Sequence, residues 1–202
     1  MWIAHVPYEE SGGRLRSLYD RVKGPDDNVD NIMLAHSLRP HSMEGHMALY
    51  KYVLHHAGNT VPKWFLETLG VHVSLLNACA YCVEHHFSGL RRLLADDARA
   101  SAIRTALESG DLDGSFSEPE SAALRYSHIL SRTPSNQPEL RRGLDAMRAA
   151  GLDDGQILEI NQVVAYFAYA NRTVLGLGVT TDGDILGLSP GNSDNPDDWS
   201  HR

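Results

Sequence analysis

Cysteine is scarce in this sequence of 202 residues: only Cys79 and Cys82 occur, three positions apart. Secreted domains that need disulfides to hold a small core contain several cysteines spread along the chain. A single closely spaced pair is not such a framework. In a reducing compartment a pair of this kind is more often catalytic or metal-binding, so it is the first candidate for chemistry.

Positive charge is also scarce, since 18 Lys and Arg face 26 Asp and Glu and the net charge is −8. Nucleic-acid binding needs clustered Lys and Arg, so we expect no nucleic-acid partner. No apolar run approaches the roughly 18 residues of a membrane span. The first residues, Met1–His5, lack the charged and apolar regions of a signal peptide. We therefore expect a soluble, cytoplasmic protein without a membrane partner.

Segments of alternating period rich in Val, Ile and Thr are missing as well, so we expect little or no sheet. Helical periodicity instead covers most of the chain and predicts helices at residues 12–23, 41–57, 62–76, 79–95, 96–109, 118–132, 136–149 and 153–176. A polar loop is expected at 110–114. The fold class is all-α, with one domain over residues 1–180. Residues 181–202 are polar and form either a mobile tail or an arm on a neighbouring subunit.

The dithiol lies at the predicted start of a helix. Asn77 is a good N-cap residue, which would put both cysteines in the first turn, where the helix dipole favours a thiolate. Cys82 and His86 are four residues apart, so their side chains can meet on one helix face. Cys79 lies about 10 Å from His86 along the axis but is close enough to Cys82 to form a disulfide. The spacing therefore pairs Cys82 with the imidazole and makes Cys79 the resolving thiol.

Two other interpretations of the cysteines remain open. A tetrahedral zinc site would need His86 and one more histidine, such as His72 or His85, because there is no third cysteine. Alternatively, both cysteines could be buried as small apolar side chains. Both are weaker than redox chemistry on the ligand count and the spacing.

A family resemblance is carried by Glu67, eleven residues, Cys79-Ala80-Tyr81-Cys82, three more residues and His86. This pattern resembles the AhpD-like peroxidase group of the carboxymuconolactone decarboxylase superfamily. Residues 164–172, followed by 177–179, are similar to the peroxidase-related branch of that superfamily. The likeness runs from about residue 30 to 180. It implies an AhpD-like multi-helix domain with the CxxC at a helix N-terminus.

The resemblance also implies a mechanism. Glu67 and His86 would relay protons, Cys82 would attack an alkyl or hydrogen peroxide, and Cys79 would close a disulfide that a dithiol donor, possibly a lipoyl protein, reduces. No cofactor or metal is implied. Some family members carry a histidine between the cysteines, where this chain has Tyr81. A phenol can donate a hydrogen bond but cannot act as a base near neutrality.

Three further expectations stay open at this point. Glu67 could instead form a surface ion pair with Lys63, four residues earlier. The same dithiol could serve a non-peroxidase disulfide or quinone-type reductase, or a non-catalytic oligomeric module that binds a metal or senses redox state. The family forms trimers and hexamers, and the apolar residues of the last helix predict a homo-oligomer interface: Ile157, Ile160, Val163, Val164, Phe167 and Val174.

Overall fold

The computed structural model describes residues 1–112 and 114–202, so residue 113 of the predicted 110–114 loop lies outside the described part. The described chain is helical, and the helices are α1 (Gly13–Val22), α2 (Asn31–Leu34), α3 (Pro40–Leu54), α4 (Lys63–Leu76), α5 (Ala80–Leu94), α6 (Asp97–Ser109), α7 (Glu118–Arg132), α8 (Gln137–Ala149) and α9 (Asp154–Leu177). No strand occurs among these residues, although Pro190 and His201 form one isolated bridge. The all-α prediction is confirmed, and every predicted helix is present. The short α2 and the 3-10 helices at Tyr8–Glu10 and Pro25–Asp27 were not predicted.

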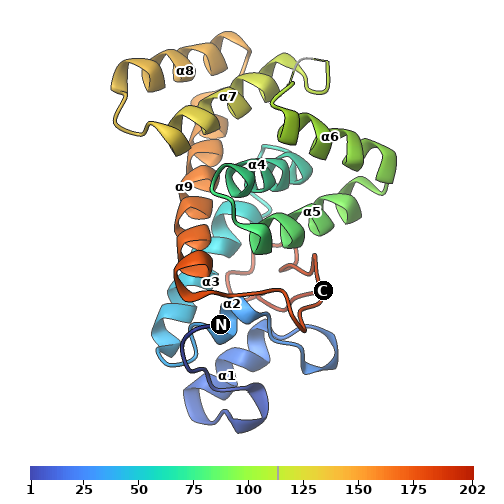
Figure 1. Cartoon of the computed structure of the whole chain (residues 1–202), viewed down its shortest axis with the longest axis vertical. Helices are drawn as coiled ribbons and strands as arrows, with labels where there is room; N and C mark the ends of the chain where they lie inside the picture. The colour runs from blue at the N-terminus through green and yellow to red at the C-terminus, as the bar shows by residue number, and fades with distance from the viewer. Residues whose placement is uncertain (113) are drawn as a thin grey trace.

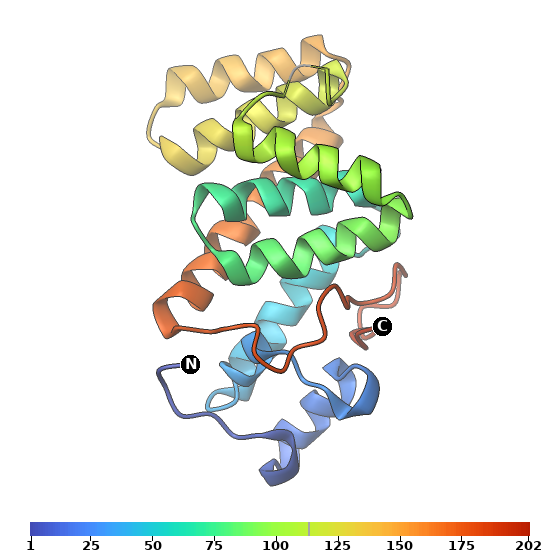
Figure 2. The same ribbon diagram turned by 45° about the vertical axis from the view of Figure 1, so that its right-hand side comes forward.

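Helix α9 runs along the long axis of the molecule and the other helices pack around it (Figure 1). Helices α6, α7 and α8 lie toward one end, and α1, α2 and α3 lie toward the other (Figures 1 and 2). Between them, α4 packs against α5, α7 and α9. No helix of the described residues is long and apolar enough to cross a membrane.

The six apolar side chains of α9 that predicted a subunit interface are buried within this one chain. All six residues that predicted a subunit interface are at most 6% exposed: Ile157, Ile160, Val163, Val164, Phe167 and Val174. The surrounding helices of the same chain already cover these six side chains. Their apolar character therefore does not indicate a subunit interface, and this part of the prediction is wrong. A homo-oligomer, trimer or hexamer, stays a prediction.

Helices α4 and α5 form a hairpin whose turn ends at the dithiol. The amide of Cys79 donates to Ser74 O at 2.9 Å and that of Ala78 donates to Leu75 O at 3.1 Å, which is a Schellman motif. Ala78 has a φ of 55°, in the left-handed region that this motif requires. Asn77 therefore closes α4 instead of opening α5, and the prediction that it is an N-cap is wrong. Cys79 occupies the N-cap position and Cys82 the first turn of α5.

A glycine inside α4 brings α9 close to the hairpin. A Cβ atom at Gly70 would clash with the ring of Phe167 on α9. Phe167 is fully buried, and its ring packs edge-on against His86 of α5 at 4.5 Å between centroids. The absence of a side chain at Gly70 therefore sets the position of the aromatic ring that contacts the candidate base.

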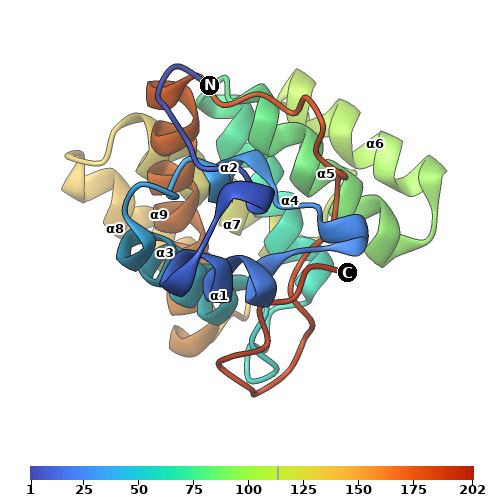
Figure 3. The same ribbon diagram turned by 90° about the horizontal axis from the view of Figure 1, so that it is seen from below.

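The segment after α9 folds back over its own chain. It runs beneath α5, between that helix and the N-terminal helices (Figures 2 and 3). Trp199 is 5% exposed and lies under the guanidinium of Arg21, 3.7 Å from its ring centroid. At the end of the chain, Arg92 donates to the carbonyl of Arg202 at 2.9 Å. Contact of residues 181–202 with a neighbouring subunit stays a prediction.

We expect Gly70→Ala to lower the free energy of unfolding by about 1–3 kcal/mol, because the added methyl overpacks the contact with Phe167. Gly45→Ala is the matched control, since a Cβ on that α3 glycine would meet no atom within 4 Å. It should raise stability by up to about 1 kcal/mol through helix propensity. Urea denaturation measures both. Equal effects of the two substitutions would contradict the close approach.

Candidate functional site

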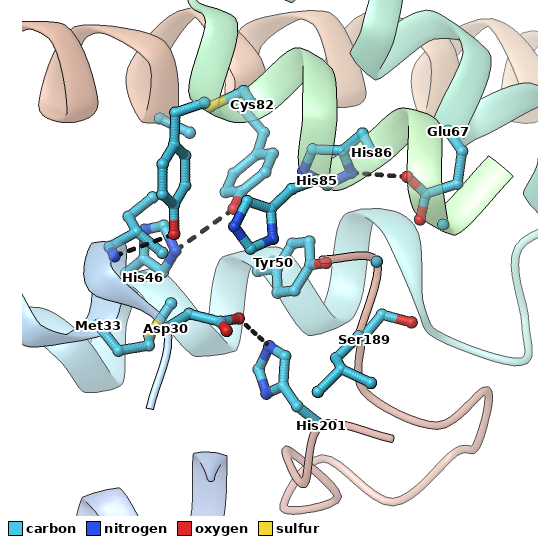
Figure 4. Close-up of a pocket in the computed structure, with 17 residues that line it drawn as sticks. Asp30, Met33, His46, Tyr50, Glu67, Cys82, His85, His86, Ser189 and His201 are labelled. Atoms are coloured by element: carbon cyan, nitrogen blue, oxygen red, sulfur yellow. Dashed lines mark hydrogen bonds and ion pairs between the residues drawn. The ribbon is translucent and has the colours of Figure 1, made fainter. Parts of the chain in front are cut away.

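A cavity of about 40 Å³ lies between α5, α3, α9 and the C-terminal segment. It brings together three of the four predicted site residues, Glu67, Cys82 and His86 (Figure 4). Cys79 does not line it. Instead, Cys79 lines a separate, more open pocket of about 220 Å³, together with Glu84 and Arg104. The two sulfurs of the dithiol thus border different cavities.

Glu67 and His86 form a buried pair across the α4–α5 hairpin. His86 Nδ1 lies 2.6 Å from Glu67 Oε2, and the Glu67 side chain is only 2% exposed. A carboxylate accepts, so Nδ1 carries the hydrogen and Nε2 is left as the unprotonated nitrogen. Nε2 has no hydrogen-bond partner among the described residues. Glu67 forms no ion pair with Lys63 in the described structure, so the surface-pair interpretation does not apply.

Both cysteines are free and buried. A hydrogen bond between the two side chains lowers the pKa of Cys79, against the opposing effect of burial. The same bond, together with burial, raises the pKa of Cys82 well above its ordinary value, while a hydrogen bond from Asn171 lowers it. Asn171 is fully buried on α9, and its amide also donates to Ser74 Oγ at 3.0 Å. The hydrogen bond between the thiols thus favours a thiolate on Cys79 over one on Cys82.

Tyr81 and His85 contact the C-terminal segment. The Tyr81 hydroxyl donates to Asp184 Oδ2 at 2.7 Å and accepts from the amide of Ile32 at 3.2 Å. His85 Nε2 lies 3.0 Å from the same Asp184 oxygen. The phenol between the two cysteines thus ties α5 to the C-terminal segment.

A zinc site is not assembled from the candidate histidines. His85 is engaged by Asp184, whereas His72 lies in a different pocket with its ring 6.4 Å from that of His128. Among the described residues, no group of three or more His, Cys, Asp or Glu side chains is arranged to hold a metal ion.

A second carboxylate, Asp30, lines the cavity and is 8% exposed. Burial raises the pKa of Asp30 to about 7, opposed by His85 and His86 of α5 and reinforced by Asp184. His201 Nε2 lies 3.8 Å from the Asp30 carboxylate, and burial lowers the pKa of His201 to about 4. At neutral pH His201 is therefore an uncharged neighbour of a carboxyl that is partly protonated.

Comparison with solved structures identifies the fold. The chain is similar to an uncharacterized peroxidase-related protein with an alkylhydroperoxidase AhpD core from Ralstonia eutropha JMP134, with a TM-score of 0.69, 20% identity and coverage of 86% of this chain and 87% of that one. The chain has the AhpD-like fold. A peroxidase-related protein from Silicibacter sp. TM1040 gives a TM-score of 0.68, 19% identity and coverage of 89% and 88%.

The AhpD-like fold is also found in the debrominase Bmp8, solved in complex with 2,3,4-tribromopyrrole, with a TM-score of 0.62, 17% identity and coverage of 83% of this chain and 82% of that one. No protein-family model and no curated protein matches the sequence. The fold predicted from the motif is confirmed, and at these identities the likeness concerns the fold alone.

Several cavity residues were missed by the sequence reasoning. Five residues outside the Glu67–Cys79–Cys82–His86 motif line the cavity: Asp30, His46, Tyr50, Tyr166 and His201. The helical spacing of His46 and Tyr50 on one face of α3 could have suggested a shared environment. No local pattern could have placed Asp30 or His201 there.

The raised pKa of Asp30 makes stability depend on pH. The folded protein holds this proton more tightly than the unfolded chain, so its contribution to stability falls as pH rises from 3.8 to about 7. Asp30→Asn cannot lose a proton, so its free energy of unfolding relative to wild type should rise over that interval, by about 2–4 kcal/mol in total. Urea denaturation of both proteins across this pH range measures the difference. A difference that is independent of pH would contradict the burial of an ionisable Asp30.

Proposed function

We propose that the protein is a thiol-dependent peroxidase that reduces hydrogen peroxide or an alkyl hydroperoxide with the Cys79–Cys82 dithiol. One observation carries the proposal: a reactive sulfur, Cys82, shares a small cavity with the unprotonated nitrogen of an imidazole that a buried carboxylate orients. Such an arrangement can remove a proton from a thiol and return it to a leaving oxygen. The AhpD-like fold of peroxidase-related proteins supports the same activity.

The reaction proceeds in two steps. The Cys82 thiolate attacks the terminal peroxide oxygen, so that an S–O bond forms as the O–O bond breaks and Cys82 becomes a sulfenic acid. The proton that His86 Nε2 has taken from the dithiol goes to the departing oxygen, which leaves as water or an alcohol. The Cys79 thiol then displaces water from the sulfenic acid and the disulfide forms.

Two observations bear on which sulfur attacks, and they point to different atoms. The hydrogen bond between the thiols lowers the pKa of Cys79 and raises that of Cys82, so the first negative charge of the pair lies on Cys79. Only Cys82, however, borders the cavity of His86. The imidazole decides, because only Cys82 shares a cavity with a group that can return a proton to the departing oxygen. The shared hydrogen bond lets the Cys82 proton pass to Cys79 as Cys82 attacks.

The Tyr50 hydroxyl can hold the peroxide in place. Tyr50 lines the cavity, and among the described residues its hydroxyl has no hydrogen-bond partner. Burial and the nearby Glu67 raise the pKa of Tyr50 well above its usual value. The phenol therefore stays protonated and can donate to a peroxide oxygen.

The disulfide must be reduced for turnover, so the protein needs a dithiol donor, possibly a lipoyl protein, and a reducing compartment such as the cytoplasm. No cofactor takes part. A homo-oligomer is compatible with this chemistry, because Glu67, Cys82 and His86 come from one chain.

A dehalogenase is the alternative suggested by the debrominase of the same fold, and a general disulfide reductase is another. A cavity needs roughly 10–15 Å³ to hold one water molecule, so the 40 Å³ beside Cys82 accommodates only a few non-hydrogen atoms. Hydrogen peroxide has two, whereas a brominated pyrrole ring or a protein disulfide is much larger. The cavity therefore favours a peroxide.

The proposal is tested by adding one equivalent of hydrogen peroxide to the reduced protein and mapping the products by mass spectrometry. We expect a Cys79–Cys82 disulfide within seconds, and a dimedone-trapped sulfenic acid on Cys82 in the Cys79→Ser variant. The two roles would be exchanged if the Cys82→Ser variant formed a sulfenic acid on Cys79 while the Cys79→Ser variant formed none on Cys82. If neither thiol reacts with hydrogen peroxide, the protein is not a thiol-dependent peroxidase.

A further inference from the structure

The C-terminal segment supplies one wall of the Cys82 cavity. Gly187, Leu188, Ser189 and His201 all line it, and Figure 4 shows Ser189 and His201 below Tyr50 and Asp30. Apart from Asp30, which directly precedes α2, the remaining walls are helical, from α2, α3, α4, α5 and α9. Because this wall is a segment without helix or strand, its position depends on the contacts that hold it.

Buried polar contacts hold the segment at both ends. Asp184, whose side chain is 2% exposed, binds Tyr81, His85 and the amide of Asn31, all within 3.2 Å. Further along, the fully buried amine of Lys51 donates to the carbonyl of Gly191 and to Ser193 Oγ. A buried amine or carboxylate without a partner is costly, so these contacts strongly favour the closed position.

Between these ends, Gly187 lies directly on α5. Its φ is +81°, and a Cβ there would come within 2.9 Å of Ser88 and of the Gly89 amide, in the helical turn that follows His86. Leu188 packs on the other side, because a Cβ on Gly24 would come within 2.8 Å of the Leu188 side chain. The segment is thus wedged between α5 and the N-terminal region, and only glycine at 187 allows this approach.

We infer that residues 183–202 determine the size of the substrate, by closing the Cys82 cavity to all but hydrogen peroxide and hydroperoxides with a small organic group. This inference rests on the proposed function for the identity of the substrate. The role of the segment as a wall does not depend on the proposed function, because the segment would screen Cys82 from any reagent that enters through the cavity.

Gly187→Ala tests the inference, and Gly183→Ala is its matched control. Both glycines have a positive φ, +81° and +86°, so both substitutions strain the backbone, but a Cβ on Gly183 meets no atom within 4 Å. Only the first should push the wall away from α5. Leu188→Ala is a second test that removes part of the wall without backbone strain, in case Gly187→Ala does not fold by circular dichroism.

Two measurements separate the access of reagents to Cys82 from its reaction with peroxides. The first is the rate of Cys82 alkylation by N-phenylmaleimide relative to N-methylmaleimide, mapped by mass spectrometry. The second is the rate of thiol oxidation by cumene hydroperoxide relative to hydrogen peroxide. We expect both ratios to rise at least tenfold in Gly187→Ala and Leu188→Ala, and to keep the wild-type value in Gly183→Ala.

Unchanged ratios in both wall variants would overturn the inference, as would an equal rise in Gly183→Ala. A raised maleimide ratio in a protein that no peroxide oxidises would support the wall while it refutes the proposed function. A raised maleimide ratio with an unchanged peroxide ratio would overturn the assignment of substrate size to this segment.

Discussion

The hydrogen bond between His86 Nδ1 and Glu67 Oε2, 2.6 Å long and almost wholly removed from solvent, joins the two helices that carry the site. A buried carboxylate is unfavourable without a partner, so the α4–α5 hairpin must hold these two side chains in register. The Schellman turn at Ala78 sets where α5 begins. The missing side chain at Gly70 admits Phe167 against the imidazole. This arrangement holds the imidazole that we propose as the base in the cavity that Cys82 lines.

The C-terminal segment is also held in place by buried polar contacts, and it forms one wall of the cavity that we propose for the substrate. It buries Asp184 against Tyr81 and His85, and it covers the Lys51 amine. The residue that stands between the two cysteines thereby has a structural contact instead of a place in a proton relay. Burial lowers the pKa of His46 to about 3 and that of His201 to about 4, and His85 is held by Asp184. Of the histidines that line the cavity, we therefore propose His86 as the base.

The long helices and the fold class could be predicted from local sequence patterns. Helical periodicity gave the long helices because an apolar face repeats within each segment, and the Glu67–Cys79–Cys82–His86 spacing predicted the fold. The helix start at Asn77 was wrong because the Schellman turn needs its left-handed residue at Ala78, which alanine adopts only at some cost. The contacts of Asp184 with Tyr81, 103 residues apart, and of His201 with Asp30 depend on tertiary packing. No local pattern encodes them.

The claim that Glu67 and His86 activate Cys82 is tested most directly by rapid-mixing measurement of the second-order rate constant for hydrogen peroxide with the reduced protein. His86→Ala should lower it by about 100-fold, the usual contribution of general acid–base catalysis. Glu67→Gln should lower it at least tenfold, while Glu108→Gln, a carboxylate on the exposed face of α6, should leave it unchanged. A rate constant that is the same in wild type and His86→Ala would contradict the account.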